Sequence, residues 1–444
     1  MSKSISADEL GRFRDNLQSR KDVAVIARSV AKNGILASAT DYKAATKMEP
    51  VFSIDLDTGK VADQKRSGRC WMFACLNTMR HAIREEYKVA DDFELSQNYT
   101  FFWDKLEKAN YFYENVLKTA DLPTSDRKVA WLMTTPQQDG GQWDMIMAII
   151  EKYGVVPQSV MPETVNSSNS TEINDTLNLK LRKDAVELRE MVAANATDDD
   201  IATRKEKMLT EVYRMLAYSF GEPPTTFDFE YRDKDNNFHR DTNLTPKKFF
   251  DKYVGWNLSD YVSIINGPTK DKPYNHMYTV EMLGNVVGGR EVRHLNVDMN
   301  EFRKVAIKQL EAGESVWFGC DVGKESDRKK GIMDTNLYHQ DELFDVDFSM
   351  SKADRLDYCQ SLMTHAMVLT GVDLVDGEPT KWKVENSWGD KVGTKGFFVM
   401  SNDWMEEYCY QVVVNKKYLP DELKQVLNEE PTMLKPWDPM GSLA

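Results

Sequence analysis

The chain has 444 residues, of which 41% are hydrophobic and 11% aromatic, enough for a large buried core. Its formal charge of -14 at pH 7 gives no global attraction to nucleic acid or to an anionic membrane. The first ten residues lack the apolar centre of a signal peptide, and no run of about eighteen apolar residues occurs. We therefore expect a soluble, cytoplasmic protein that does not bind membranes.

The cysteines exclude two kinds of stabilising site. They are odd in number and irregularly spaced, so they do not form a disulfide framework, and no two of them form a CxxC pair. Without such a pair a structural zinc site is not expected. We expect reduced thiols, no metal and no cofactor. The five residues are Cys70, Cys75, Cys320, Cys359 and Cys409.

The first half of the chain has helical periodicity. We expect amphipathic helix within 7–33, mostly helix within the aromatic-rich segment 94–135, and another helix at 144–153 that Gly154 ends. Charged helix formers with regularly spaced apolar residues at 173–220 predict a helical insertion. For the aromatic cluster we expect core packing or subunit contact rather than a cofactor site.

Cys70 lies where a polar loop meets an apolar helical run. Apolar residues recur every three or four positions from Met72 to Ile83, which predicts a helix that begins at Cys70 and ends near Tyr87. Free N–H groups and the helix dipole stabilise an anion at such a position, so we expect a lowered thiol pKa and a nucleophilic thiolate. The alternative is an ordinary buried cysteine, which suits Cys75 better.

Beyond residue 259 the pattern is mainly extended. Short apolar runs alternate with turns, and one helix is expected at 299–310. A twisted antiparallel sheet or barrel beside a helical first half makes an α+β fold. The expected divisions are 1–165 for the N-terminal segment and helical lobe, 166–250 for the helical insertion, 251–420 for the sheet lobe and 421–444 for a C-terminal arm.

A cysteine nucleophile needs a base and a group that orients the base. His365 leads an apolar strand that can hold its imidazole rigidly, and Asn386 ends the strand that follows the next turn. Two strands joined by a turn can place these side chains together. A cysteine, a histidine and an asparagine alone prove little, because any chain of this size contains them. We interpret the other histidines as surface or turn residues: His81, His239, His276, His294 and His339.

Several short segments resemble those of papain-like cysteine peptidases. They are Gln64 to Trp71, Gly140-Gly141, Thr364-His365-Ala366 and Asn386-Ser387-Trp388-Gly389, and they occur in the expected chain order. More narrowly, Arg66 to Trp71, the helical insertion and Pro436 to Gly441 resemble the bleomycin hydrolase and bacterial aminopeptidase C branch. Members of that branch are intracellular enzymes.

The resemblance implies a papain-like two-lobe fold, with Cys70 in the helical lobe and His365 and Asn386 in the sheet lobe. It implies that Cys70 attacks the scissile carbonyl as a thiolate, that His365 holds the proton as an imidazolium and delivers it to the leaving amine, and that Asn386 fixes the ring through its side-chain oxygen. An oxyanion hole is implied for the Gln64 side chain and the Cys70 N–H. The implied substrate-binding residues are Gly140, Gly141, Trp388 and Ala444.

Two departures from the secreted papain pattern are informative. Ser67 stands where the secreted enzymes have a disulfide cysteine, which agrees with a reducing compartment. In the plain fold about 130 to 150 residues separate the cysteine from the histidine, and here roughly 150 more lie between Cys70 and His365. We place most of these in 94–135 and 173–220.

The resemblance implies a broad-specificity aminopeptidase that acts on peptides with a free N-terminus through a thioester, assembled as a homohexamer. Residues 430–444 have no helical or strand period, and their prolines favour an extended arm. In the family the terminal carboxylate of this arm gates the cleft; a frayed tail is the alternative. Other functions left open are an endopeptidase or acyl transferase on the same site, and a nucleic-acid-binding protein, which the net charge disfavours. A monomer is the alternative to the hexamer.

Overall fold

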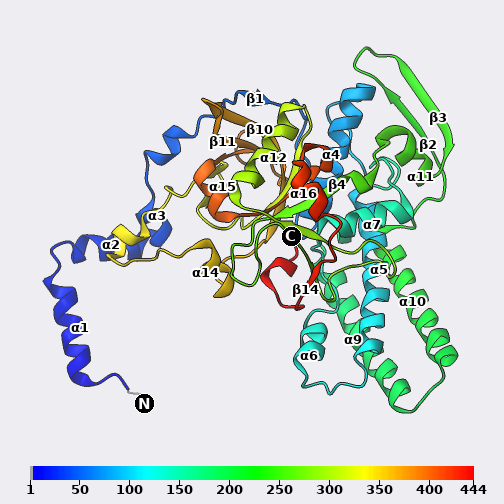
Figure 1. The fold of residues 1–444 in the computed structure, drawn as a ribbon, viewed down its shortest axis with the longest axis horizontal. Coiled ribbons are helices and arrows are strands. Elements are labelled where there is room, and N and C mark those ends of the chain that lie inside the picture. Colours follow the sequence, from blue (N-terminus) through cyan, green and yellow to red (C-terminus); the bar gives the residue numbers. More distant parts are fainter. Residues whose placement is uncertain (1–3) are drawn as a thin grey trace.

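The structure, a computed structural model, describes residues 4–444. A helical lobe lies on one side and a large sheet with its covering helices on the other, and the C-terminus ends between them (Figure 1). The expected α+β, two-lobe arrangement is confirmed. None of the helices in 4–444 is long and apolar enough to cross a membrane.

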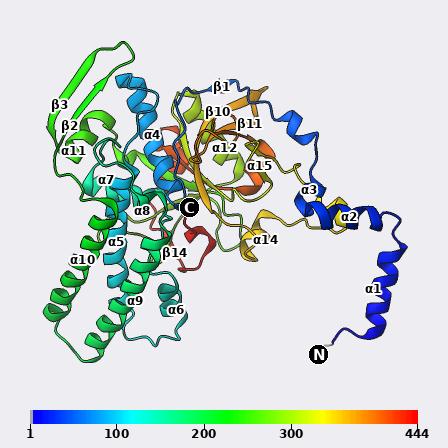
Figure 2. The same ribbon diagram turned by 180° about the vertical axis from the view of Figure 1, so that it is seen from behind.

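The N-terminal segment extends away from both lobes, which the view from behind also shows (Figure 2). Ser6 and Glu9 form a capping box that starts its first helix. No residue of the first two helices is buried, although Leu10, Phe13 and Leu17 are apolar. The helices are α1 (Ala7–Ser19), α2 (Val23–Asn33) and α3 (Ile35–Ala39).

The helical lobe is built around the helix that begins at Cys70. That helix runs from Cys70 to Tyr87 as predicted, and most of its residues are buried because other helices cover one side and the sheet the other. The aromatic block belongs to the core, since Tyr99, Phe101 and Phe102 are almost fully buried. The lobe comprises α4 (Cys70–Tyr87), α5 (Gln97–Lys118), α6 (Arg127–Thr134), α7 (Trp143–Tyr153) and α8 (Val165–Ser168).

The predicted helical insertion is a pair of long helices that pack against α5. Its buried leucines recur at helical spacing, and Thr197 caps the second helix after a short turn. A two-stranded hairpin and a short helix follow. The elements are α9 (Thr171–Ala193), α10 (Asp198–Phe220), β2 (Phe227–Arg232), β3 (Phe238–Leu244) and α11 (Pro246–Phe249).

The second half forms one twelve-stranded sheet in the order β14-β5-β6-β4-β13-β7-β10-β11-β12-β9-β8, with β1 paired to β10. The sheet is mainly antiparallel, as predicted, but three pairs of strands run parallel, which the sequence did not indicate: β4–β6, β5–β14 and β9–β12. Its strands are β1 (Ile54–Asp55), β4 (Tyr261–Ile265), β5 (His276–Val280), β6 (His294–Asn296), β7 (Val316–Cys320), β8 (Ser326–Asp327), β9 (Ile332–Met333), β10 (His365–Val375), β11 (Glu378–Glu385), β12 (Phe397–Ser401), β13 (Cys409–Asn415) and β14 (Thr432–Leu434).

Helices cover the sheet and complete its core. The predicted helix at 299–310 is present and buries Phe302, Val305 and Leu310 among residues of the sheet. Sequence periodicity did not predict the shorter helices, nor the strand β14 in the C-terminal segment. The helices are α12 (Met299–Glu311), α13 (Gln340–Phe344), α14 (Lys352–Asp357), α15 (Asn402–Tyr408) and α16 (Asp421–Val426).

Candidate active site

Cys70 is the first residue of α4 and is almost fully buried. Its thiol sulfur accepts a hydrogen bond from the backbone N–H of Ala366, the residue after His365. The contact brings the cysteine of the helical lobe to the start of β10 in the sheet lobe. The two residues predicted to be nucleophile and base therefore meet across the lobes.

Strand register places Asn386 beside His365. In the antiparallel pair β10–β11, Glu385 lies opposite Val368, so Asn386 comes level with Met367, two residues from His365 and on the same face of the sheet. The Nε2 atom of His365 lies 2.9 Å from Oδ1 of Asn386. Because that oxygen can only accept, Nε2 carries a proton, which leaves Nδ1 to exchange a proton with a thiol.

The low thiol pKa expected for Cys70 is not found. Burial raises the pKa of the thiol to about 11, although the N–H groups of Ala366, Trp71 and Cys70 itself act in the opposite direction. Burial likewise lowers the pKa of His365 to about 4. Burial thus opposes the charged form of each group.

Trp388 covers the imidazole, with ring centroids 4.9 Å apart. The segment of Gln64 is joined to the segment of Trp388, since the backbone N–H of Gln64 donates to the carbonyl of Ser387 at 2.8 Å. Its side-chain amide donates one hydrogen bond to the Ser67 carbonyl at 2.6 Å. An amide nitrogen has two N–H groups, so one remains for a bound oxyanion.

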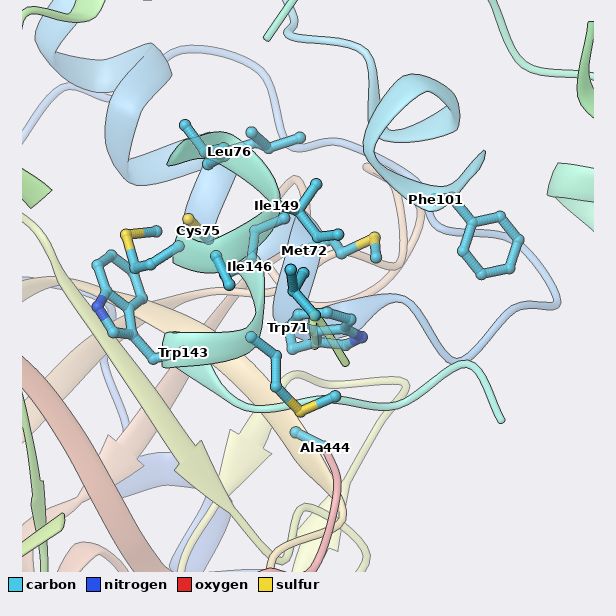
Figure 3. Close-up of a cluster of buried hydrophobic side chains, with 14 of the residues drawn as sticks. Trp71, Met72, Cys75, Leu76, Phe101, Trp143, Ile146, Ile149 and Ala444 are labelled. Carbon is cyan, nitrogen blue, oxygen red and sulfur yellow. The ribbon is translucent and has the colours of Figure 1, made fainter. Parts of the chain in front are cut away.

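The two adjacent glycines contact the end of the chain. The backbone N–H of Gly141 donates to an oxygen of the terminal carboxylate of Ala444 at 3.2 Å, and the N–H of Ala444 donates to the carbonyl of Gly141 at 3.3 Å. A Cβ at Gly140 would lie 2.8 Å from the same Ala444 oxygen, and one at Gly141 would lie 2.5 Å from the Trp71 ring. Both positions thus require glycine. Figure 3 shows Ala444 at the edge of the apolar cluster that contains Trp71 and Met72.

The C-terminal arm is fixed at several points before it reaches Ala444. Gln142 Nε2 donates to the Ser442 carbonyl at 2.5 Å, and Ser442 Oγ donates to the Met363 carbonyl at 2.6 Å. Further back, the guanidinium of Arg127 stacks 3.8 Å from the Trp437 ring centroid. These contacts, together with strand β14, contradict the alternative of a frayed tail.

Sequence reasoning missed Asp139, the residue before the two glycines. Its carboxylate accepts from Lys105 Nζ at 2.8 Å and from the Gly68 N–H at 2.9 Å, and its backbone carbonyl accepts from Trp71 Nε1 at 2.8 Å. Burial opposes the charge, but Lys105 outweighs it and holds the pKa of Asp139 well below its usual range. Asp139 therefore joins the glycine loop to both sides of Cys70.

Two of the dismissed histidines are not surface residues. His294 is buried and its Nδ1 lies 2.7 Å from Ser263 Oγ. His81 lies 3.0 Å from the buried carboxylate of Glu385, which also pairs with Arg80 at 2.7 Å. Because Glu385 precedes Asn386, this cluster ties the cysteine-bearing helix to the asparagine-bearing strand. Sequence spacing contained no signal for it, since the partners are far apart in the chain.

The arrangement supports nucleophilic attack by sulfur with proton transfer through an imidazole. The C-terminus of the chain is paired with Gly141, two residues after the Asp139 carbonyl that Trp71 contacts. No group of three or more potential metal ligands occurs within 4–444.

Comparisons with known proteins agree with this geometry. The model of the Peptidase C1-like family matches residues 4–441. Aminopeptidase C of Lactobacillus helveticus is 55% identical, covering 100% of this chain and 99% of that protein. Aminopeptidase C of Listeria innocua is 53% identical, with 100% of both chains covered. The crystal structure of PepW from Lactobacillus rhamnosis HN001 is similar with a TM-score of 0.99 at 65% identity, over 100% of both chains.

Replacing Asp139 by Asn should lower both stability and activity. The change leaves the buried Lys105 ammonium without its counterion, which typically costs about 3–5 kcal/mol, and frees the loop that contacts Cys70. A carboxylate with a lowered folded pKa stabilises the fold above its unfolded pKa of about 3.9 and loses that effect as pH falls through the folded pKa. The difference in free energy of unfolding between the variant and wild type, measured by urea denaturation, should accordingly be largest at pH 7 and become smaller in acid.

The matched control for Asp139 is Asp175→Asn. Asp175 is an exposed carboxylate near the start of α9. We expect it to leave the unfolding midpoint and kcat/KM unchanged. Equal stability of the Asp139→Asn variant and wild type at pH 7 would contradict the role given to the Lys105–Asp139 pair.

Proposed function

The chain belongs to the Peptidase C1-like family and is a cysteine peptidase, and from this premise we propose that it is a broad-specificity thiol aminopeptidase whose own C-terminus gates the site. The observation that carries the proposal is the pairing of Ala444 with Gly141. Two hydrogen bonds to one residue are how an extended substrate adds to a strand edge. Ala444 thus fills the place of a substrate residue on the acyl side.

The reaction begins at the pair of Cys70 and His365. Nδ1 of His365 takes the thiol proton as the sulfur attacks the scissile carbonyl, and the imidazolium returns that proton to the leaving amine when the C–N bond breaks. The acyl group is then held as a thioester on Cys70. Water, deprotonated by His365, hydrolyses the thioester and releases the N-terminal residue.

Two donors stabilise the oxyanion that develops on the attacked carbonyl. They are the second side-chain N–H of Gln64 and the backbone N–H of Cys70. Loss of one such donor commonly costs about 3 to 4 kcal/mol of transition-state stabilisation. The amide of Gln64 is suited to this task because its other hydrogen bonds hold it still.

Asn386 and Trp388 act on His365 without reacting. The Asn386 oxygen keeps the proton on Nε2 and fixes the plane of the ring. Trp388 excludes water from this bond by covering the ring. Loss of orientation weakens an enzyme more than it abolishes the chemistry, because the nucleophile and the base remain.

The terminal carboxylate of Ala444 explains selection for free N-termini. An α-carboxylate and a substrate α-ammonium carry opposite charges at pH 7. Two unit charges 4 Å apart attract by about 4 kcal/mol at an effective dielectric constant of 20. A few kcal/mol of this kind favours a free N-terminus about ten- to a thousandfold, while the arm blocks a substrate that continues past the site.

The alternatives left open have less support. An endopeptidase needs an open acyl side, and Ser442, Leu443 and Ala444 occupy it. An acyl transferase would use the same thioester and differ only in the acceptor. Nucleic-acid binding has against it the net charge of -14.

Assembly as a cytoplasmic homohexamer is part of the same proposal. The exposed large apolar side chains in 4–444 include Phe13 on the N-terminal helix and Leu179 and Tyr218 on the helical insertion. Exposed apolar groups of this kind are typical of subunit contacts. A closed assembly with inward-facing sites would admit peptides and exclude folded proteins.

Replacing Cys70 by Ala should abolish hydrolysis of unblocked peptides and leave the fold intact. The control is Cys75→Ser on the same helix. Cys75 is fully buried among apolar residues, so its hydroxyl should cost about 1–3 kcal/mol of stability while kcat at a temperature below the transition stays near wild type. Residual turnover by the Cys70→Ala enzyme would show that another residue is the nucleophile.

Deleting Gly441 to Ala444 should sharply lower aminopeptidase turnover and allow cleavage of N-blocked peptides. The deletion removes the terminal carboxylate from Gly141 and opens the acyl side toward a cavity of about 510 Å³ bordered by the arm. Mass spectrometry of products from a matched pair of free and N-acetylated peptides measures the change. Met433→Ala, on an exposed side chain of the same arm, is the control.

If the shortened enzyme keeps its full preference for free N-termini, the arm is not the gate. Another acidic group would then have to bind the substrate ammonium.

Light scattering at micromolar concentration should give about six times the single-chain mass of 51.1 kDa. Placing a charge in either apolar surface, as in Phe13→Asp or Tyr218→Asp, should lower that mass because an unpaired charge cannot be buried in a contact. A wild-type mass near 51.1 kDa would reject the hexamer.

A further inference from the structure

Arg328 lies close to the imidazole, in the turn between β8 and β9. Its guanidinium carbon is 4.0 Å from the Trp388 ring centroid, and that ring lies 4.9 Å from the ring of His365. The Arg328 charge is near enough to lower the pKa of His365, an effect second to burial among those that lower it. A positive charge is thus stacked directly behind the residue that covers the base.

The Arg328 guanidinium has no hydrogen bond or ion pair with any protein group in 4–444, and its side chain is exposed. The acidic groups nearby already have partners. Asp63, which bridges to Trp388, pairs with Lys65 at 2.6 Å, and Asp327 pairs with Lys330 at 3.4 Å. In a chain of net charge -14 this is an unusual place for an unpaired guanidinium.

Arg328 lies on the side of the scissile bond from which the leaving amine departs. The C-terminal arm reaches the site from Gly140, Gly141 and Met363 and fills the acyl side. The leaving amine must therefore depart in the other direction, past His365, which gives it a proton. There it meets Trp388 and then Arg328.

The spacing suits the first residue after the scissile bond. The guanidinium carbon of Arg328 lies at most about 9 Å from the His365 ring centroid, because the Trp388 ring centroid is 4.0 Å from the one and 4.9 Å from the other. A terminal or side-chain carboxylate lies about one to two residue lengths of 3.3–3.6 Å from the nitrogen of its own residue. With its scissile nitrogen hydrogen-bonded to His365, such a carboxylate comes within hydrogen-bond reach of the guanidinium N–H groups. Arginine binds carboxylates through two parallel hydrogen bonds, and stacking on an aromatic ring holds it ready for them.

We propose that Arg328, held by Trp388, binds a carboxylate on the leaving residue of the substrate. The enzyme would then favour two classes of peptide: dipeptides, whose terminal carboxylate is on that residue, and longer peptides with Asp or Glu there. The inference rests on the proposed aminopeptidase function and adds a specificity-determining residue to it.

The test compares charged and neutral forms of one leaving residue. A free dipeptide and its C-terminal amide differ only in the terminal carboxylate. Tripeptides with Asp or Asn after the scissile bond differ only in the side-chain carboxylate. Values of kcat/KM for each pair are measured at one pH, so that any change in the pKa of His365 affects both members alike. The ratio of charged to neutral substrate is the readout.

Wild-type enzyme should prefer the charged member of at least one pair about tenfold at low salt, and the preference should fall as salt screens it. In Arg328→Gln the ratio should fall close to one. Lys329→Gln, an exposed lysine next in the chain that does not stack on Trp388, should keep the wild-type ratio. Which pair shows the preference tells whether a terminal or a side-chain carboxylate is bound.

A wild-type ratio of one for both pairs would overturn the proposal. So would equal losses on charged and neutral substrates in Arg328→Gln, because that is what a purely structural role beside Trp388 predicts. Failure of the underlying function looks different: wild-type enzyme would then release no N-terminal residue even from the neutral amide.

Discussion

The antiparallel register of β10 and β11 is the constraint on which the site depends. It sets Glu385 opposite Val368 and so brings Asn386 level with Met367, two residues from His365 and on the same face of the sheet. A shift by one residue would place Asn386 on the face opposite to His365. The same register positions Glu385 to bind Arg80 and thus holds the helix of Cys70 against the sheet.

A second constraint joins the cysteine to the glycine loop that pairs with the C-terminal residue. Asp139 contacts the segment before and after Cys70, and the two residues that follow it pair with or pack against Ala444. Buried lysines of α5 hold this loop, since Lys105 pairs with the Asp139 carboxylate and Lys108 donates to the Gly140 carbonyl. Buried charges of this kind are costly unless paired, so they fix geometry more than they add stability.

Charge is distributed unevenly along the site. The terminal carboxylate of the chain lies at Gly141, whereas an unpaired guanidinium lies over Trp388. The proposed function assigns these opposite charges to the two sides of the scissile bond. Residues 328, 388 and 444 are all far from Cys70 in the chain, so this polarity arises only in the folded protein.

Local patterns were sufficient for much of the fold. Apolar spacing after Cys70, the charged helical pair at 173–220 and most strands of the second half could be predicted because neighbouring residues determine helix and strand periodicity. Short motifs around Cys70, His365 and Asn386 likewise pointed to the site. Where periodicity is weak, as in β14 and the short helices, the sequence was not sufficient.

Only the tertiary structure decided the parallel pairings, the burial of His294 and His81, the raised pKa of the Cys70 thiol and the partners of Asp139. Each depends on contacts between segments far apart in the chain or on exclusion of water by the assembled lobes. Burial opposes a charge whatever the local motif favours. The sequence by itself therefore determined the motifs of Cys70, His365 and Asn386, and packing determined the shifts in their pKa values, the residues that support them and the place of the chain's end.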